Sequence, residues 1–419
     1  MADKDMERYV RQMRWQLERT PLSRRGFMWA SAMSATAAFL AACSGGGGAA
    51  TAAPASAAAS VEPSVTVPSE STAAVESLGP EPSFEVPPDI EKELFMYNWS
   101  GYVDPNNMKQ FQEVFGVDKF TYDTFDANDE MMAKFQGGAT GQWDICCPTM
   151  NYVPAMIQQG FIQKLDLARL PNLKYVDKTF KGQYWDPTDE YSVPKDWGTT
   201  GISVRTKDVK EPVKTWREFL DVIPQYSGKV VFVDSPDDVF IAPLKANGYS
   251  LNSDVKEELD KAREELMKVA PHILALDSDQ YNTKIETEEA VLGLTWTGGI
   301  LELRDKPETA DTVYTIPEDG TVFWLDTWVV LTDPPHPVAG HAFINFIHEP
   351  HIQAIETETN RYATPDSAAK QFIDPKMLAD EALFVPDEVV AKLEPQKDNS
   401  GITQRQDIWA EFKSKIGQG

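Results

Sequence analysis

Short apolar segments alternate with helix-forming segments from Glu93 to the C-terminus, and this alternation most limits the possible folds. We expect buried strands over residues 94–99, 144–148, 202–204, 230–233, 292–296 and 323–331. Helices are expected over residues 104–115, 128–135, 153–159, 240–247 and 255–269. Such alternation is typical of parallel sheets covered by helices on both faces. About 330 residues suffice for two cores rather than one, so the sequence predicts an α/β protein with two lobes and one sheet in each.

The residue types at the predicted helix ends support this assignment. Asp104 and Pro105 stand where a helix cap and a first turn favour them, and Gly116 follows the last apolar residue of the same helix. Asn128 is expected to cap the next helix, and Gly160 to end the one after it.

The N-terminal segment has the pattern of an export signal. Arg24 and Arg25 precede a weakly hydrophobic run over residues 26–42, and Cys43 closes the run after Leu-Ala-Ala. The run is shorter and less apolar than the roughly 20 residues that a bilayer span needs. The pattern predicts a twin-arginine lipoprotein signal peptide over residues 1–42 and a lipidated Cys43. An ordinary N-terminal anchor helix with a chance cysteine is the alternative.

Residues 43–89 are expected to form a flexible tether. They are almost wholly Gly, Ala, Ser, Thr, Pro, Val and Glu, and the first aromatic residue is Phe84. Such a composition buries too little apolar surface to offset the entropy of ordering the chain. A disordered segment of this length spans roughly 35–40 Å on average.

The formal net charge of −26 argues against nucleic acid as a partner, because phosphate binding requires a basic surface. A field of this sign attracts cationic ligands, although solubility alone also explains it. The remaining cysteines, Cys146 and Cys147, are adjacent in an apolar segment. We expect two small buried thiols there, with a vicinal disulfide as the alternative in an oxidising compartment.

No residue pattern indicates a catalyst, a cofactor or a metal site. His341, His348 and His351 lie in one segment, but Pro350 interrupts the helical spacing that would direct two imidazoles at one ion, and we expect these histidines at exposed helix ends. Nucleophile-elbow and phosphate-loop motifs are missing from the sequence. The pair Asp237–Asp238 could serve a glycosidase, but chance pairs are common in so acidic a chain.

Aromatic residues and carboxylates gather at the predicted strand ends. Trp99, Trp296, Trp324 and Asp326 all lie there, where ligands bind in open α/β sheets. An indole face attracts an ammonium group, and a carboxylate holds it with a charge-assisted hydrogen bond. The sequence therefore favours a site for a cationic ligand; packing of the Trp residues in a core is the alternative.

From about Leu94 onward the chain resembles the spermidine/putrescine-binding proteins that serve bacterial ABC importers. The segments that carry the resemblance are residues 95–103 (FMYNWSGYV), 191–194 (YSVP) with Trp197-Gly198, 293–298 (GLTWTG), 323–326 (FWLD) and 362–365 (YATP). The resemblance implies a type II periplasmic-binding-protein-like fold, in which hinge strands cross between the lobes near residues 191–199 and 323–331. Residues 90–196 and 325–372 would form the first lobe, and residues 197–324 and 373–419 the second.

The resemblance also implies a set of ligand-binding residues: Trp99, Ser100, Tyr102, Thr149, Asp238, Trp296, Trp324, Asp326, Tyr362 and Gln396. In the family, the aromatic residues matched by Trp296, Trp324 and Tyr362 would line the methylene chain. The acids matched by Asp326 and Asp238 would take the ammonium groups. This chain departs from the family at Gly101 and Ser235, where relatives tend to carry an acid, and at Asn151, where they carry an aromatic residue. The departures imply that one end of the site has lost charge, which favours a diamine at least as much as a triamine.

These observations predict an exported solute-binding protein, anchored by lipid to the outer face of the cytoplasmic membrane, that acts as a monomer. It would capture a polyamine and deliver it to an ABC permease, and its chain near Gln396 would return to the site. Three alternatives remain open at this point. They are the same fold with another cationic or amino-acid-like ligand, an exported hydrolase that uses a carboxylate pair, and a tethered polyamine sensor.

Overall fold

The structure is a computed structural model, and it describes residues 84–399 and 401–417. The predicted signal peptide (1–42), the lipidated Cys43 and the tether up to residue 83 lie outside the described residues. Within the described part of the chain, no helix is both long enough and apolar enough to cross a membrane.

A single path of hydrogen-bonded strands runs through the described residues. The strands are β1 (Glu93–Trp99), β2 (Lys119–Phe125), β3 (Ile145–Cys146), β4 (Ser192–Arg205), β5 (Val230–Phe232), β6 (Ile273–Leu276), β7 (Leu292–Trp296), β8 (Thr312–Thr315), β9 (Val322–Val330) and β10 (Glu394–Pro395). Their order is β2-β1-β3-β9-β4-β7-β5-β6, with β10 beside β9 and β8 beside β4. The pairs β1–β2, β1–β3, β5–β6, β5–β7 and β9–β10 are parallel, and the others are antiparallel.

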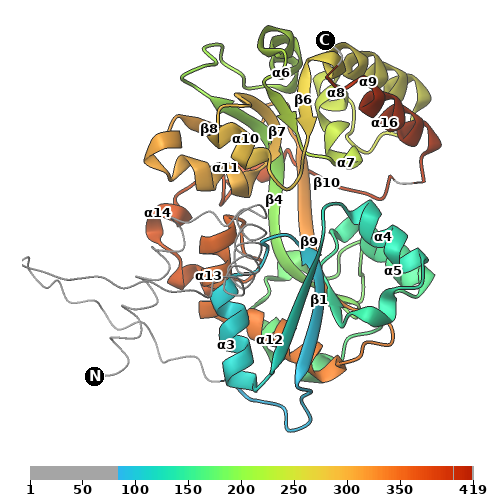
Figure 1. The fold of residues 1–419 in the computed structure, drawn as a ribbon, viewed down its shortest axis with the longest axis vertical. Helices are drawn as coiled ribbons and strands as arrows, with labels where there is room; N and C mark the ends of the chain where they lie inside the picture. Colours follow the sequence, from blue (N-terminus) through green and yellow to red (C-terminus); the bar gives the residue numbers. More distant parts are fainter. Residues whose placement is uncertain (1–83, 400, 418–419) are drawn as a thin grey trace, which may run out of the picture. The chain divides into compact units, whose positions relative to one another are not determined.

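The strands β4 and β9 join the two lobes (Figure 1). The first part of β4, residues 192–199, pairs with residues 323–329 of β9. Its second part, residues 200–205, pairs instead with β7 and β8 in the other lobe. The sequence predicted one separate sheet in each lobe. The structure differs, because β4 belongs to both halves and joins them into one continuous sheet. The crossing strands implied by the resemblance are confirmed, and β4 and β9 are called the hinge strands below.

Helices flank each half of the sheet (Figure 1). Those of the first lobe are α3 (Pro105–Phe115), α4 (Asn128–Gln136), α5 (Val153–Gln159), α12 (Pro337–Ile347) and α13 (Pro350–Asn360). Those of the second lobe are α6 (Trp216–Val222), α7 (Pro236–Val239), α8 (Ile241–Ala246), α9 (Lys256–Val269), α10 (Tyr281–Glu286), α11 (Thr297–Arg304) and α16 (Thr403–Lys415). The short helices α14 (Pro375–Leu378) and α15 (Asp387–Val390) follow α13 along the chain. The 3-10 turns are η1 (Thr140–Gln142), η2 (Met150–Tyr152), η3 (Leu167–Arg169), η4 (Pro171–Tyr175), η5 (Lys178–Phe180), η6 (Ile223–Tyr226), η7 (Ala270–His272), η8 (Pro307–Thr309) and η9 (Ser367–Phe372).

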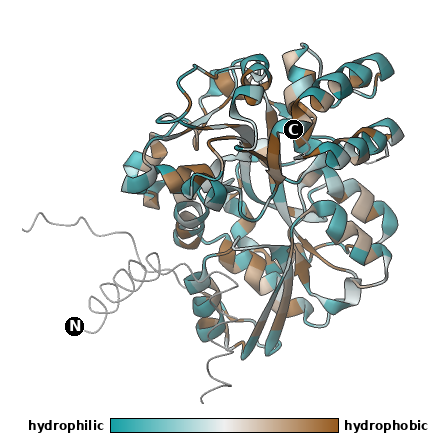
Figure 2. Ribbon diagram, turned by 45° about the horizontal axis from the view of Figure 1, so that its top comes forward, coloured by the Kyte–Doolittle hydropathy of each residue, from teal (hydrophilic) through white to brown (hydrophobic). Residues whose placement is uncertain are grey.

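Apolar residues are buried on both faces of the first-lobe sheet. Leu94 and Met96 of β1 belong to one hydrophobic cluster, and Phe95 and Tyr97 to another. This division follows from the alternation of side chains along a strand. The second lobe has its own cluster around Trp216. Figure 2 shows the result, with hydrophobic strands inside and hydrophilic outer faces on the helices.

Most predicted helix ends are confirmed, and one is wrong. The Asp104 carboxylate caps α3, and Gly116 and Gly160 end α3 and α5 in the left-handed conformation. Asn128, however, does not cap α4, because Ala127 occupies the cap position without a side-chain hydrogen bond. The Asn128 amide is instead engaged with Thr149, at the candidate site described below.

The first residue that the structure describes, Phe84, belongs to the segment predicted as tether. The Phe84 ring lies 6.0 Å from that of Phe115 and 5.0 Å from that of Phe346, between centroids. Five residues later, Asp89 forms an ion pair with Arg169 at 2.8 Å. The last residues of the predicted tether are therefore attached to α3 and α12 of the first lobe.

Two of the three histidines discussed above, and both cysteines, are buried in the fold. His341 and His348 are both buried, and Nδ1 of His348 lies 2.9 Å from the Asp366 carboxylate, so the expectation of exposed helix ends is wrong for these two residues. Cys146 and Cys147 are buried free thiols, as the first of the two alternatives predicted. Among residues 84–399 and 401–417, no group of His, Cys, Asp and Glu side chains has the arrangement of a metal site.

Candidate ligand-binding site

Asp326, on hinge strand β9, lies at the centre of the predicted site residues. Its carboxylate accepts hydrogen bonds from the Thr149 hydroxyl at 2.7 Å and the Tyr102 hydroxyl at 2.8 Å. Only 7% of Asp326 is exposed. Burial raises the pKa of Asp326 to about 6, although both hydroxyl groups favour the charged form. We call Asp326, Tyr102 and Thr149 the first subsite.

Asn128 holds Thr149 in place and was missed as a site residue by sequence reasoning. Its Nδ2 donates to the Thr149 hydroxyl at 2.9 Å, and its Oδ1 accepts from the Thr149 backbone N–H at 3.2 Å. The Thr149 hydroxyl therefore has its proton available for Asp326. In the sequence, Asn128 stands at the start of a predicted helix and was therefore interpreted as its cap. This interpretation gave Asn128 the wrong role.

A buried ion pair lies behind Tyr102. The Lys195 ammonium is 3.6 Å from the centroid of the Tyr102 ring and is hydrogen-bonded to the Asp196 carboxylate. Lys195 is 1% exposed and Asp196 is not exposed at all. Adjacent residues of a regular strand point to opposite faces, but the β4–β9 register shifts between Pro194 and Asp196. This irregularity allows the two side chains to meet.

Aromatic rings adjoin the first subsite. Tyr362 meets Tyr102 edge-on at 5.7 Å and Trp324 at 5.0 Å, between centroids. Two glycines make room for these rings, since a Cβ atom at Gly198 would lie 2.7 Å from the Trp324 ring and one at Gly298 would lie 2.6 Å from the Tyr362 ring. Close packing against these rings thus explains the glycines of Trp197-Gly198 and Thr297-Gly298.

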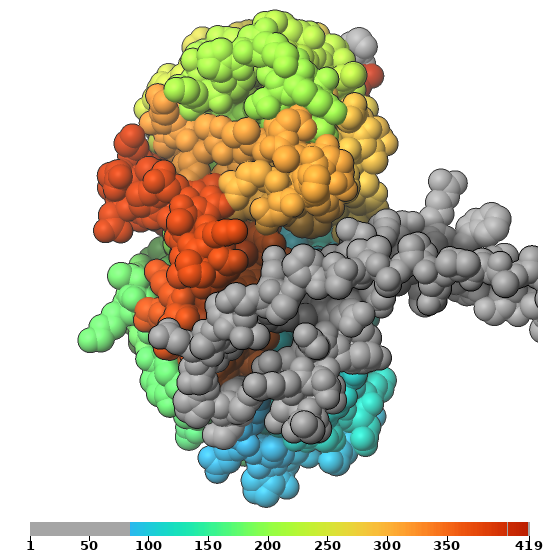
Figure 3. Space-filling model, turned by 90° about the vertical axis from the view of Figure 1, so that its left-hand side faces the viewer, coloured from blue at the N-terminus to red at the C-terminus, as the bar shows by residue number. Residues whose placement is uncertain are grey.

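The backbone around Tyr362 connects α13 to the second lobe. Arg361 ends α13 in the left-handed conformation, at φ 58°, and its guanidinium pairs with Asp305 after α11 at 3.0 Å. Ala363 forms an isolated bridge with Trp197 of β4. In Figure 3 the orange-red segment that includes α13 lies between the surfaces of the two lobes on one side of the molecule. Tyr362 is therefore fixed from both sides.

Asp238 occupies α7 in the second lobe. It accepts hydrogen bonds from the Thr200 hydroxyl and from Nε1 of Trp296, the latter at 3.3 Å. Burial raises the pKa of Asp238, and these hydrogen bonds oppose the shift. Trp296 also meets Trp99 of the first lobe edge-on at 5.9 Å. The two lobes thus contact one another through this pair of indoles.

A second contact between the lobes joins Asn151 and Asp237. Asn151, the middle residue of η2, donates from Nδ2 to the Asp237 carboxylate at 3.2 Å. Burial raises the pKa of Asp237 to about 7. Sequence reasoning had assigned Asp237 only to a chance acidic pair, because nothing in the sequence places α7 beside η2.

Gln396 and Ser100 complete the predicted set. The chain near Gln396 does return to the hinge strands, where its backbone N–H donates to the Phe323 carbonyl at 3.1 Å and its own carbonyl accepts from the Tyr184 hydroxyl. Gln396 is buried. Ser100 is exposed, one residue beyond the end of β1.

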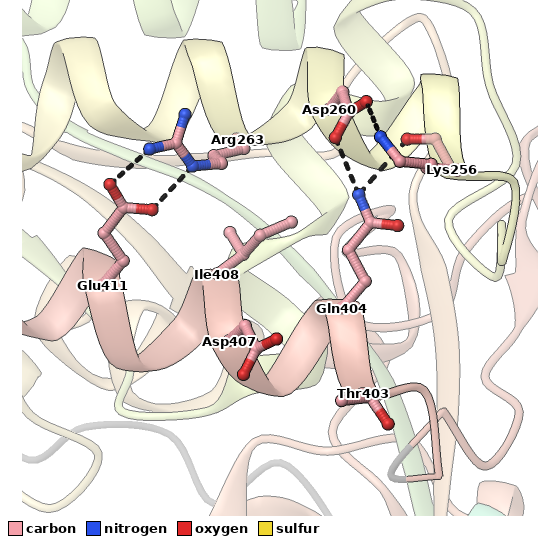
Figure 4. Close-up of a pocket in the computed structure, with 8 residues that line it drawn as sticks. All are labelled: Lys256, Asp260, Arg263, Thr403, Gln404, Asp407, Ile408 and Glu411. Atoms are coloured by element: carbon pink, nitrogen blue, oxygen red, sulfur yellow. Dashed lines mark hydrogen bonds and ion pairs between the residues drawn. The ribbon is translucent and has the colours of Figure 1, made fainter.

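A groove on the outer surface of the second lobe contains none of these residues. It lies between α9 and α16, and its charged side chains pair with one another, as Arg263 does with Glu411 and Lys256 with Asp260 (Figure 4). This internal pairing leaves the groove without an evident ligand, and we do not assign it a role.

Two α/β lobes joined by hinge strands, with polar and aromatic side chains meeting between them, define a binding protein of the periplasmic-binding-protein-like class. The chain belongs to the bacterial extracellular solute-binding protein family, whose sequence pattern matches residues 107–385. Members of this class work outside the cytoplasm, in agreement with the predicted export.

Named relatives cover most of the chain. The spermidine/putrescine-binding periplasmic protein of Escherichia coli is 30% identical over 333 residues, which are 79% of this chain and 93% of the relative. The putrescine/agmatine-binding protein of Pseudomonas aeruginosa is 30% identical over 319 residues, 72% of this chain and 86% of the relative. Among solved structures, the spermidine/putrescine ABC transporter substrate-binding protein of Streptococcus pneumoniae matches with a TM-score of 0.65 at 26% identity, covering 78% of this chain and 99% of its own.

Proposed function

We propose that this protein captures a polyamine outside the cytoplasmic membrane and delivers it to the permease of an ABC importer. The observation that carries the proposal is the first subsite, where a buried carboxylate is held by two neutral hydroxyl groups beside aromatic rings. Relatives named for spermidine and putrescine binding support the same ligand class.

The chemistry of the first subsite suits an ammonium group. Hydroxyl donors leave the negative charge of Asp326 in place, and each carboxylate oxygen keeps a lone pair for a further donor. A primary ammonium brings three donors and a positive charge, so it forms charge-assisted bonds that water cannot match. We propose that Trp296, Trp324 and Tyr362 cover the methylene chain and that Asp238 takes part in binding a second cationic group.

Ligand capture would proceed by closure of the lobes about the hinge strands. We propose residues 90–196 and 325–372 as one moving body, and residues 197–324 and 373–419 as the other. The change of β4 from β9 to β7 and β8 at Thr200 supports a boundary in this region. The closed form would be the one that docks on the permease.

Membrane anchoring through Cys43 is a separate part of the proposal. Cys43→Ala should leave the protein unprocessed or release it from the membrane fraction, and replacement of Arg24 and Arg25 by Lys should block export. Cell fractionation measures both. Unchanged membrane retention of Cys43→Ala would contradict the lipid anchor, and normal export of the arginine variant would indicate another secretion route.

Calorimetry on the purified protein tests the ligand class. Putrescine and spermidine should bind with micromolar or tighter dissociation constants, about −8 kcal/mol or better, whereas glutamate and glucose should give no heat of binding. If glutamate binds and neither polyamine does, the protein is a carrier of amino-acid-like solutes.

A further inference from the structure

Asp237 and Asn151 adjoin the end of the site where the sequence departs from the polyamine-binding family. Ser235, at the position of a family acid, accepts the backbone N–H of Asp238 at 3.3 Å and so serves α7 as a cap. A carboxylate is nevertheless present two residues further on, at Asp237, and it contacts Asn151 of the other lobe.

The Asn151 amide has one hydrogen-bonding group in use and one not. Its Nδ2 donates to Asp237, which fixes the orientation of the amide, because a carboxylate only accepts. Its Oδ1 is buried without a hydrogen-bond partner among the described residues, and the whole residue is 1% exposed. A buried acceptor without a donor is costly, so the position lacks a donor group.

The charges around Asp237 favour a cation as that donor. Asp238, Asp129 and Asp398 act on Asp237 in the sense of added negative charge, and the opposing charge is that of Arg405. The Arg405 guanidinium, however, donates to the backbone carbonyls of Leu251 and Ser253. The Nε and Nη2 donors of Arg405 are thus engaged with backbone carbonyls.

Asp237 is also at a short distance from the first subsite. Thr149, which donates to Asp326, and Asn151, which donates to Asp237, are separated by one residue of the η2 turn. A rise of about 2 Å per residue in a 3-10 turn places their Cα atoms on the order of 5 Å apart. Thr149 and Asn151, close together on one short turn, thus each donate a hydrogen bond to a different carboxylate.

We propose that Asp237 and Asn151 form a second ammonium subsite, occupied by the far amino group of a polyamine whose near amino group binds Asp326. The ammonium donates to the Asp237 carboxylate and to Oδ1 of Asn151. This inference rests on the proposed function and assigns to two residues the role that Ser235 has lost. Each of the two subsites binds one amino group, so together they select ligands with a cationic group at both ends.

Calorimetry with a matched pair of ligands tests the second subsite. The pair is putrescine and butylamine, which is putrescine with one amino group removed. For Asp237→Asn we expect putrescine affinity to fall about 10- to 100-fold, while butylamine affinity changes by less than about twofold, within the scatter of a distant substitution. Asp221→Asn, an exposed aspartate of α6, is the control and should change neither.

Asn151→Leu provides a second variant with a similar shape and an intact Asp237. It should weaken putrescine by about tenfold through loss of one acceptor and again spare butylamine. The inference is overturned if both variants bind putrescine as the wild type does, or if both ligands weaken equally. If wild-type protein binds neither ligand, nor spermidine, the proposed function fails first and this inference with it.

Discussion

The carboxylates at the two ends of the candidate site are held in different ways. Asp326 lies on hinge strand β9 and receives both of its hydroxyl donors, Tyr102 and Thr149, from the first lobe. Asp237 receives its donor from across the interface between the lobes. In the proposed closure, the first subsite would therefore exist before the lobes close, whereas the second would form only on closure. A ligand that engages both would gain part of its binding energy from closure itself.

The largest expected effect concerns the ion pair that supports the first subsite. Lys195→Met leaves Asp196 buried without its counter-charge, which typically costs about 3–5 kcal/mol of unfolding free energy. The double variant Lys195→Met/Asp196→Leu removes both charges and should recover most of that loss. Urea denaturation of the ligand-free protein measures both. Equal stability of the single variant and the wild type would show that the ion pair does not stabilise the fold.

Asp326→Asn should have the next largest effect, this time on affinity. The substitution keeps the shape but leaves a bound ammonium in a dry site without its counter-charge, at a cost of about 2–5 kcal/mol, or roughly 30-fold to several thousand-fold. In contrast to Asp237→Asn, it should weaken butylamine as strongly as putrescine. Calorimetry compares the variants, with the exposed Asp118→Asn as control. Unchanged polyamine affinity would contradict the assignment of the first subsite.

Trp296 should contribute less, because its removal changes no net charge. Trp296→Ala is expected to cost about 1–3 kcal/mol of polyamine binding through loss of ring contact. Trp296→Phe keeps an aromatic face but loses the hydrogen bond from Nε1 to Asp238, and it should retain most of the affinity. If Phe proves as damaging as Ala, the hydrogen bond to Asp238 matters more than the ring.

The last expected effect is a dependence on pH, which is small near pH 7 and grows as the pH falls below the pKa of each carboxylate. Burial raises the pKa of Asp326 to about 6 and that of Asp237 to about 7. The folded protein thus binds these protons more tightly than the unfolded chain, so their contribution to ligand-free stability is full below about pH 4 and is lost as the pH rises through both values. A bound ammonium favours the charged carboxylates, and polyamine affinity should rise over the same window.

Thermal unfolding with and without spermidine, from about pH 5 to 8, measures the two trends. The ligand-induced rise in midpoint temperature should grow with pH, and Asp326→Asn and Asp237→Asn should each flatten the profile. A profile unaffected by either substitution would assign the pH dependence to other groups.

Local signals in the sequence predicted part of the fold but missed, among other elements, strand β2 and helices α12 and α13, and contacts distant in sequence escaped prediction. The strand 292–296 and the helix 153–159 were predicted with the bounds that the structure has. The apolar pattern predicted hinge strand β4 only over residues 202–204, because its first half contains Lys195 and Asp196. A hinge strand near residues 191–199 was expected from the resemblance alone. The partners of those charges come from the tertiary fold.

The candidate site shows the same difference between what the sequence indicated locally and what contacts distant in sequence determine. The aromatic and acidic residues at strand ends were named from the resemblance, but Asn128 was mistaken for a helix cap and Asp237 for a chance acid. The departures at Ser235 and Asn151 predicted a loss of charge. The structure places the Asp237 carboxylate beside Asn151. The expectation that a diamine binds at least as well as a triamine stays a prediction, which the calorimetry with putrescine and spermidine tests.

The packing of Phe84 has a mechanical consequence for the membrane anchor proposed at Cys43. Any force transmitted along the preceding chain reaches the folded part at α3 and α12, where Phe84 lies. Trp99, at the opposite end of β1, is about 20 Å away along the strand, at roughly 3.3 Å per residue. With the proposed anchor, tension would be borne by the first lobe alone, at the end away from the predicted ligand residues. The second lobe would carry no load and could move in the proposed closure without working against the anchor.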